Sequence, residues 1–195
     1  MKQRDKKKII SDCLDQYINI LHNHDIFKNI IKAMELMSNA NQNGNKAIFF
    51  GNGASAAIAS HAALDFKKQA KINTMSLNDP TIITAYANDY GYENWIQSAV
   101  ESYCLKGDVV VLISSSGQSA NILNAAKYVH EKKENALITF SGFSINNPLR
   151  QCGEVNFWVD SKGYNIVECV HQIWLMLICD LIVGKLEYSV CQRKT

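Results

Sequence analysis

The stretch that decides the fold is KAIFFGNGAS, residues 46–55. A short apolar run leads into a small polar loop, and an Ala-rich segment with helical periodicity follows it. The same order returns in DVVVLISSSGQS, residues 108–119, which also precedes an Ala-rich segment. Strands that read as continuous apolar runs and alternate with helices are typical of a parallel sheet covered on both faces.

Both polar loops have the features of an anion-binding site. The first amides of a helix have no internal partner, and the helix dipole adds partial positive charge there. Glycine lets the backbone approach a ligand closely, and serine hydroxyls add donors. In a doubly wound sheet of order 2-1-3-4-5, strands 1 and 3 are neighbours, and ligands bind beyond their carboxyl ends. The two loops follow those strands, so they predict one phosphate-binding pocket.

The whole chain, residues 1–195, is expected to form one three-layer α/β sandwich with a five-stranded parallel sheet of order 2-1-3-4-5. Helices predicted over 9–21 and 25–39 make residues 1–44 a helical hairpin that packs on a sister subunit. Asp25 is expected to be the N-cap of the second of these helices, which turns Ile30, Ile31, Met34 and Met37 inward. The five strands are predicted at 46–50, 72–77, 108–113, 136–140 and 155–159. The remaining helices are predicted at 54–69, 81–88, 93–104, 119–132 and 165–184.

Composition indicates an ordinary globular protein. Hydrophobic residues make up 47% and charged residues 19% of the 195, and the net charge is +2. This charge gives no reason to expect a nucleic-acid partner, and the basic run from Lys2 to Lys8 is interpreted as a solvated helix tip. The six cysteines, the last of them Cys191, have no C-x-x-C spacing and are expected to be reduced thiols. No apolar leader and no 18-residue apolar span is expected, so we predict a cytoplasmic protein without a membrane segment.

The loop motifs differ from the best-known nucleotide and serine-nucleophile motifs. The first loop has no third glycine and no acidic residue at the end of the next strand, as a dinucleotide fingerprint requires, and it has no Gly-Lys-Ser/Thr. The second loop, the serine loop of residues 114–119, has no G-x-S-x-G elbow. Hydroxyls at four of six positions, 114–119, therefore favour phosphate binding over nucleophilic catalysis.

The two loops, with Asn88-Asp89-Tyr90-Gly91 between them, resemble the sugar isomerase (SIS) domain, and nearly the whole chain resembles the phosphoheptose isomerases within it. That resemblance implies a homotetramer with pockets at subunit interfaces. It also implies conversion of sedoheptulose 7-phosphate into a heptose phosphate for surface polysaccharide, such as lipopolysaccharide or capsule. Carried over to matching positions, it implies that substrate and phosphate are held by Asn52, Gly53, Ser55, Asp89, Ser114, Ser115, Ser116, Ser119 and Asn165.

The resemblance also raises the question of zinc. His61 and Asp65 lie four residues apart on a predicted helix and therefore face one way. The family has His and Glu here, and some members bind zinc through them, which makes His61, Asp65 and Glu168 the candidate ligand set. A surface His–Asp pair without a metal is the alternative.

Glu168 and His171 open the last helix at i, i+3 spacing among apolar residues. A carboxylate in apolar surroundings is costly to bury unless paired, and burial makes a carboxylate a stronger base. The alternative is that Glu168 only caps the start of the helix. The family usually has Gln in place of Glu168, a catalytic and metal-binding His in place of Met176, and Asp in place of Asn165.

The sequence therefore predicts an aldose–ketose isomerase for a sugar phosphate, with altered catalytic residues. Glu168 would move the proton through an enediolate, and His61 or His171 would shuttle hydroxyl protons. The rival hypotheses are a binding protein, like a branch of the superfamily that binds the replication initiator, and a phosphosugar sensor without chemistry.

Overall fold

The computed structural model of this chain describes residues 3–186. It contains a five-stranded sheet of order β2-β1-β3-β4-β5 with every pairing parallel, which confirms the predicted order. The strands are β1 (Ala47–Gly51), β2 (Thr74–Ser76), β3 (Val109–Ile113), β4 (Ala136–Ser141) and β5 (Val155–Trp158). Lys2 and Cys191, named in the sequence analysis, lie outside the described residues.

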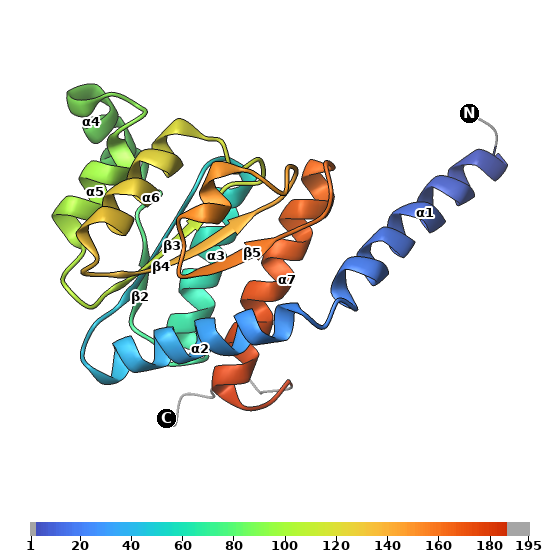
Figure 1. Cartoon of the computed structure of the whole chain (residues 1–195), viewed down its shortest axis with the longest axis horizontal. Coiled ribbons are helices and arrows are strands. Elements are labelled where there is room, and N and C mark those ends of the chain that lie inside the picture. Colours follow the sequence, from blue (N-terminus) through green and yellow to red (C-terminus); the bar gives the residue numbers. More distant parts are fainter. Residues whose placement is uncertain (1–2, 187–195) are drawn as a thin grey trace, which may run out of the picture.

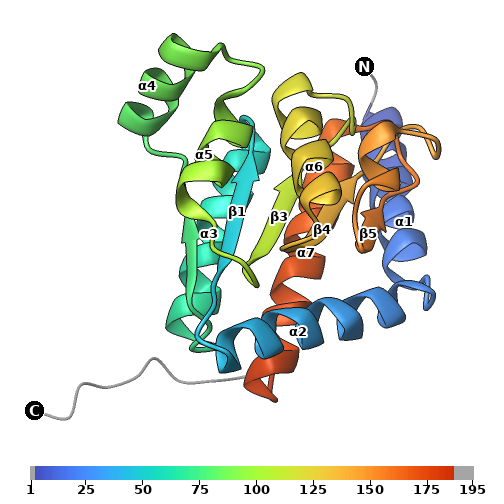
Figure 2. The ribbon, with the colours of Figure 1, turned by 60° about the vertical axis from the view of Figure 1, so that its left-hand side comes forward.

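Helices cover both faces of the sheet, as the three-layer prediction requires (Figures 1 and 2). One layer contains α2 (Ile26–Gln42), α3 (Ala54–Lys68) and α7 (Tyr164–Val183). The other contains α4 (Pro80–Tyr90), α5 (Trp95–Tyr103), α6 (Ala120–Lys132) and the 3₁₀ turn η1 (Pro148–Gln151).

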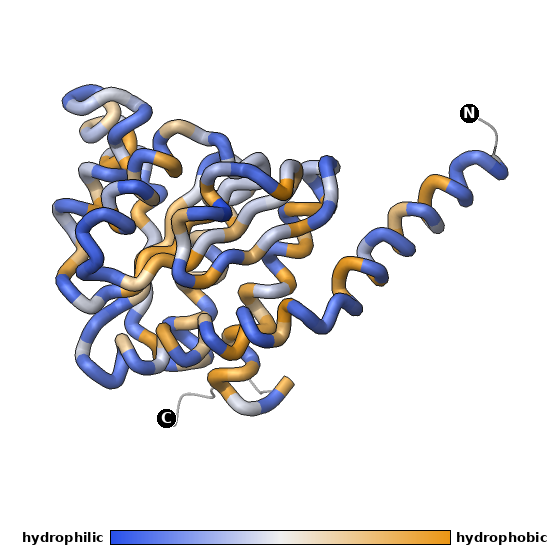
Figure 3. The backbone as a smooth tube through the Cα atoms, viewed as in Figure 1, coloured by the Kyte–Doolittle hydropathy of each residue, from blue (hydrophilic) through white to orange (hydrophobic). Residues whose placement is uncertain are grey.

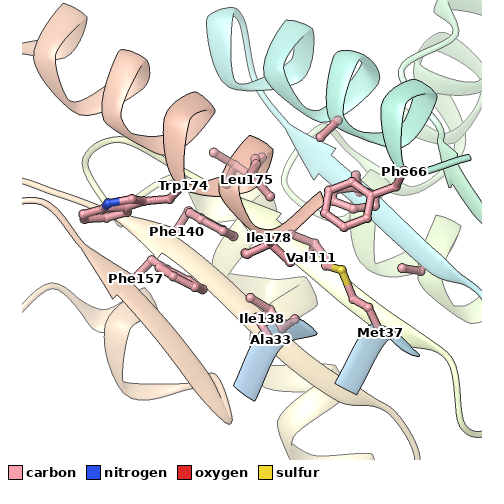
Figure 4. Close-up of a cluster of buried hydrophobic side chains, with 14 of the residues drawn as sticks. Ala33, Met37, Phe66, Val111, Ile138, Phe140, Phe157, Trp174, Leu175 and Ile178 are labelled. Atoms are coloured by element: carbon pink, nitrogen blue, oxygen red, sulfur yellow. The ribbon is translucent and has the colours of Figure 1, made fainter. Parts of the chain in front are cut away.

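Strands β1 and β3 are buried along their whole length, which explains their unbroken apolar sequences. Successive side chains point to opposite faces. Phe49 and Val111 enter the cluster under α2, α3 and α7, whereas Phe50 and Leu112 enter the cluster under α5 and α6. Figure 4 shows the first cluster, in which Trp174 of α7 lies beside Phe140 and Phe157 of the strands, and Ile178 lies on the side of the cluster that contains Phe66 and Met37.

Both predicted N-terminal helices form, but they do not pair as a hairpin within the single chain (Figure 1), and the packing of residues 1–44 on a sister subunit stays a prediction. Helix α1 (Gln3–Leu21) points away from the body of the protein and diverges from α2 (Figure 1). Asp25 has helical dihedral angles, φ −61° and ψ −24°, and its side chain caps nothing. The link of residues 22–25 is formed by turns, and within it the backbone N–H of Asp25 donates to Asn23 Oδ1 over 3.0 Å.

Helix α2 turns only part of its predicted apolar set inward. Ile30 and Met37 are buried and Met34 packs against the same cluster, but Ile31 is 47% exposed, so its predicted inward position is wrong for the single chain. Successive residues on a helix are 100° apart, and the face that buries Ile30 therefore leaves Ile31 at its edge.

The prediction that no long apolar span exists is also wrong. Helix α7 has 20 residues and contains an 18-residue window with a mean hydropathy of 1.9, enough by length and composition to cross a membrane, and Figure 3 shows its apolar colouring. A core helix of a soluble protein passes the same test. The burial of Val170, Trp174 and Ile178 against the sheet is that of a core helix.

Candidate functional site

The pairing of the central strands sets the two polar loops side by side. Gly51, the last residue of β1, is the register partner of Ile113, the last residue of β3. The loops are then tied together by two amides: Asn52 Nδ2 donates to Asn121 Oδ1, and Asn121 Nδ2 donates to Asn52 Oδ1, each over 2.9 Å. This edge of the sheet is where ligands bind in doubly wound folds.

The first loop depends on its glycines. A Cβ on Gly51 would lie 2.5 Å from the backbone carbon and oxygen of Ser55, so only glycine fits where the strand turns into α3. Gly53 occupies the N-cap position of α3 with φ +54° and provides no capping side chain. The start of α3 therefore has no side-chain acceptor of its own and suits an anion.

The serine loop has a similar helix start at its end. Ser119 is the N-cap of α6, but its hydroxyl caps no backbone amide and instead lies 3.2 Å from Ser114 Oγ. Ser116 Oγ accepts from the backbone N–H of Gln118 over 3.2 Å. Both helix starts therefore present polar groups at the junction of the two loops.

The segment after β4 supports the serine loop from below. The backbone N–H of Gly142 donates to the carbonyl oxygen of Ser115 over 2.9 Å. Gly117 has φ +65°, and a Cβ on it would lie 2.0 Å from Oδ1 of the buried Asn147. Asn147 in turn donates to the carbonyl oxygen of Ser144 over 2.8 Å and accepts from the backbone N–H of Arg150. These contacts therefore support the observed conformation of the serine loop.

The predicted phosphate-contacting serines divide by exposure. Ser55, Ser114 and Ser115 are buried, and Ser116 and Ser119 are partly exposed. Ser116 and Ser119 are the hydroxyls that a ligand can reach directly in the single chain.

Glu168 comes to this site from α7. Ser115 Oγ donates to Glu168 Oε1 over 3.4 Å. The side chain is partly exposed rather than enclosed among apolar groups, because the inward face of α7 is taken by Val167 and His171. A carboxylate that solvent can reach beside a hydroxyl donor can exchange a proton with a bound ligand.

His171, predicted as a proton shuttle, belongs to the core. It is fully buried and packs against the rings of Phe140 and Trp174. Its Nε2 lies 3.0 Å from the carbonyl oxygen of Ser141, and its Nδ1 has no partner. Burial lowers its pKa to about 4, against the opposing effect of the bond to Ser141. A neutral, enclosed imidazole does not meet a substrate, so the predicted shuttle role does not fit His171 in the single chain.

The predicted zinc set does not assemble within one chain. His61 Nε2 lies 3.2 Å from Asp65 Oδ2 on α3, with the histidine side chain 55% exposed. Among residues 3–186, no three His, Cys, Asp or Glu side chains come together as a metal site. The donor set of a single chain therefore does not fit a zinc ion, since structural and catalytic sites use three or four protein ligands.

Two of the predicted sugar contacts lie on exposed positions beside the loops. Asp89 is exposed near the end of α4, where its carboxylate accepts from Asn88 over 2.9 Å. Asn165 is exposed in the first turn of α7, and its carbonyl oxygen accepts from the hydroxyl of Tyr17 over 3.3 Å. Within residues 3–186, neither residue hydrogen-bonds to the serine loop, and their roles stay predictions.

Sequence reasoning missed Asn121 and Tyr92. Asn121 is buried in the first turn of α6, and the hydroxyl of Tyr92 donates to Asn52 Oδ1 over 3.2 Å. A polar residue between Ala120 and Ile122, at an inward helix position, was the available signal.

A separate cleft of about 560 Å³ lies between the α1–α2 link, β5 and α7. Arg150 lies over the ring of Trp158 at its rim, 4.7 Å from the ring centre. None of the predicted site residues lines this cleft. The concave surface there is therefore distinct from the paired loops.

The fold and the paired loops are those of an SIS domain, and the SIS domain family matches residues 14–142. Two relatives named phosphoheptose isomerase, from Aquifex aeolicus and Buchnera aphidicola, are 32% and 36% identical over 84% and 82% of this chain and 86% of each relative. The chain therefore belongs to the phosphoheptose isomerase family.

Solved structures agree with this assignment. Phosphoheptose isomerase GmhA from Neisseria gonorrhoeae superposes with a TM-score of 0.82 at 26% identity, over 93% of this chain and 98% of that one. A phosphoheptose isomerase from Francisella tularensis gives 0.83 at 25% identity, over 95% and 100%.

Proposed function

We propose that this chain is a cytoplasmic aldose–ketose isomerase that interconverts sedoheptulose 7-phosphate, or a closely related phosphosugar, with its aldose in the formation of a surface-polysaccharide precursor. The observation that carries the proposal is the contact of Ser115 with Glu168, since it joins a serine loop suited to phosphate with a carboxylate suited to proton transfer. Family membership supports the same reaction class.

Glu168 is the base in this proposal. Its carboxylate removes the proton from the carbon beside the carbonyl, an enediolate forms, and the same group returns the proton to the neighbouring carbon. The substrate and product are isomers, so no oxidant or reductant is needed. Glu168 stands where the family usually has Gln, and Met176 stands where the family has its catalytic histidine. Glu168 therefore acts as the base in place of that histidine.

Phosphate binding positions the reacting carbons. The phosphate is held by the hydroxyls of the serine loop and by the starts of α3 and α6. Asn52 and Asp89 contact the sugar, and the energy of holding the phosphate keeps the sugar in a reactive geometry. His61 serves as a surface partner of Asp65 or as a carrier of hydroxyl protons, and no step passes through a metal.

The active form is a homo-oligomer, a tetramer by family resemblance. The exposed side of α1 has an apolar stripe, and the N-terminal part of α1 projects from the body of its own chain (Figure 3). A contiguous exposed apolar stripe of this kind marks an interaction surface. A second copy of the chain supplies such a surface, and the stripe consists of Ile10, Leu14 and Ile18, which are 52% to 60% exposed.

Turnover of the purified chain with sedoheptulose 7-phosphate, followed by NMR of the sugar, tests the proposal. Formation of the aldose phosphate supports it. Saturable sugar-phosphate binding without turnover would turn the interpretation to a sensor. Neither binding nor turnover, with a protein partner captured instead, would favour the binding-protein alternative.

A further inference from the structure

Asn52 and Asn121 form a closed pair between the two loops. Each side-chain amide donates once to the other and accepts once from it, over 2.9 Å. Asn121 is 2% exposed, whereas Asn52 is partly exposed. The pair therefore joins a buried residue of α6 to a residue that a ligand can reach.

A backbone N–H group fixes the orientation of both side-chain amides. The N–H of Ile122 donates to Asn121 Oδ1 over 3.0 Å. An N–H needs an oxygen, so Asn121 must point its Oδ1 at Ile122 and its Nδ2 toward Asn52. Asn52 must then present its Oδ1 to Asn121 Nδ2, and the orientation of Asn52 follows from that of Asn121.

The remaining hydrogen-bonding capacity of Asn52 can be counted. Its Oδ1 accepts from Asn121 and from the hydroxyl of Tyr92, which uses both lone pairs. Its Nδ2 has two hydrogens, and one of them bonds to Asn121 Oδ1. The side-chain amide of Asn52 can therefore offer a ligand one donor and no acceptor.

We propose that Asn121 is a positioning residue that holds Asn52 with its one unused amide N–H available to an oxygen of the bound sugar phosphate. Tyr92 assists by occupying the second lone pair of Asn52. This inference rests on the proposed function and extends it, because an oxygen that gains negative charge in the enediolate accepts a stronger hydrogen bond than the ground-state carbonyl does.

A double-mutant cycle tests the inference. The variants Asn52→Ala, Asn121→Ala and the double variant are assayed for kcat and KM with sedoheptulose 7-phosphate. Because Asn121 acts through Asn52, each single change should lower kcat by about 10- to 100-fold, and the double variant should be no slower than Asn52→Ala. Inorganic phosphate should raise the melting temperature of every variant to the same extent as in wild type.

The variant Tyr92→Phe tests the same inference without changing the buried residue Asn121. Tyr92 is 56% exposed, so the change removes one hydrogen bond without a cavity. It should lower kcat by about 3- to 10-fold in wild type and have no effect in the Asn52→Ala background. Asn124→Ala is the matched control on the same helix, because its amide bonds Asn94 and Glu93 rather than either loop. It should leave kcat unchanged.

The possible results separate the inference from the proposed function. Wild-type turnover with additive effects of Asn52 and Asn121, or of Asn52 and Tyr92, overturns the inference alone. If wild type binds sugar phosphate without turnover, the proposed function fails. The double-mutant cycle is then measured with the dissociation constant of the sugar phosphate, and additive effects again overturn the inference. If wild type binds no sugar phosphate, both fail.

Discussion

The hydroxyl of Ser115 donates to Oε1 of Glu168 over 3.4 Å, although the residues are 53 positions apart in the chain. The contact joins the loop after β3 to the first turns of α7 and connects the two halves of the proposed chemistry, phosphate binding and proton transfer. The conformation of the serine loop therefore affects both.

Gly117→Ala should distort the serine loop. The new Cβ would fall 2.0 Å from Asn147 Oδ1 at a residue with φ +65°. Gly44→Ala is the matched control, because Gly44 has φ +79° but nothing within 4 Å of the added carbon. We expect about 1 kcal/mol of destabilisation from the control, due to backbone strain alone. Gly117→Ala should cost at least about 2 kcal/mol more and abolish the stabilisation by phosphate, as measured by urea unfolding with and without phosphate. Equal effects of the two changes would contradict this account of the loop.

Asp108 should be important for stability at the opposite end of the sheet. This buried carboxylate pairs with Lys46 and accepts from the backbone N–H of Leu105. Burial alone would raise its pKa, but the hydrogen bonds from Lys46 and Leu105 outweigh burial and lower it. Asp108→Asn should cost about 3 kcal/mol in the free energy of unfolding, because it leaves Lys46 without its partner.

The contribution of Asp108 also has a predicted pH dependence. Because the folded pKa is lowered from 3.8, the contribution is complete above about pH 4 and is lost as pH falls through the folded pKa. Denaturant unfolding of Asp108→Asn from pH 7 downward measures it, with the exposed Glu131→Gln as control. A stability of Asp108→Asn equal to wild type at pH 7 would refute the role of this pair.

His171 should make the protein less stable in mild acid. Its pKa falls from 6.5 to about 4 on folding, so between these values the unfolded chain binds a proton that the folded chain does not. The free energy of unfolding should therefore decrease by about 3 kcal/mol as pH falls from 6.5 to 4. His171→Gln, which can still donate to Ser141, should flatten this slope by about one proton, whereas the exposed His22→Gln should not. An unchanged slope in His171→Gln would show that other groups cause the acid sensitivity.

The stripe on α1 should hold the oligomer together. Leu14→Glu combined with Ile18→Glu places charges on it and should yield monomers in light scattering at micromolar concentration. Asp12 is two residues from both Ile10 and Leu14 and so lies on the opposite side of the helix. Asp12→Lys should leave the oligomer intact. A wild-type chain that is already monomeric would disprove the proposal.

The sequence was sufficient for the sheet and for the pairing of the loops. Buried strands such as β1 and β3 are apolar throughout, their alternation with helices predicts a parallel sheet, and 2-1-3-4-5 is a common order of such sheets. Once β1 and β3 are neighbours, Gly51 and Ile113 end at the same edge. Local pattern and topology therefore agree at this site.

Orientation around a helix was harder to predict. Glu168 and His171 both lie on α7, yet one is partly exposed and the other fully buried. Val167, Val170, His171 and Trp174 follow i, i+3, i+4, i+7 spacing, which already marks the histidine as a core residue. The direction of α1 was not predictable, because an apolar stripe shows that a helix needs a partner but not that the partner belongs to the same chain.

Deuterium incorporation from heavy water into sedoheptulose 7-phosphate tests the role of Glu168 most directly, because it reports proton removal whether or not product is released. Wild type should exchange the hydrogen beside the carbonyl. Glu168→Gln should slow exchange by about 10²- to 10⁴-fold while phosphate still stabilises the variant. Glu154→Gln, which removes a surface carboxylate paired with Lys32, should exchange like wild type. Exchange by Glu168→Gln at the wild-type rate would contradict the account.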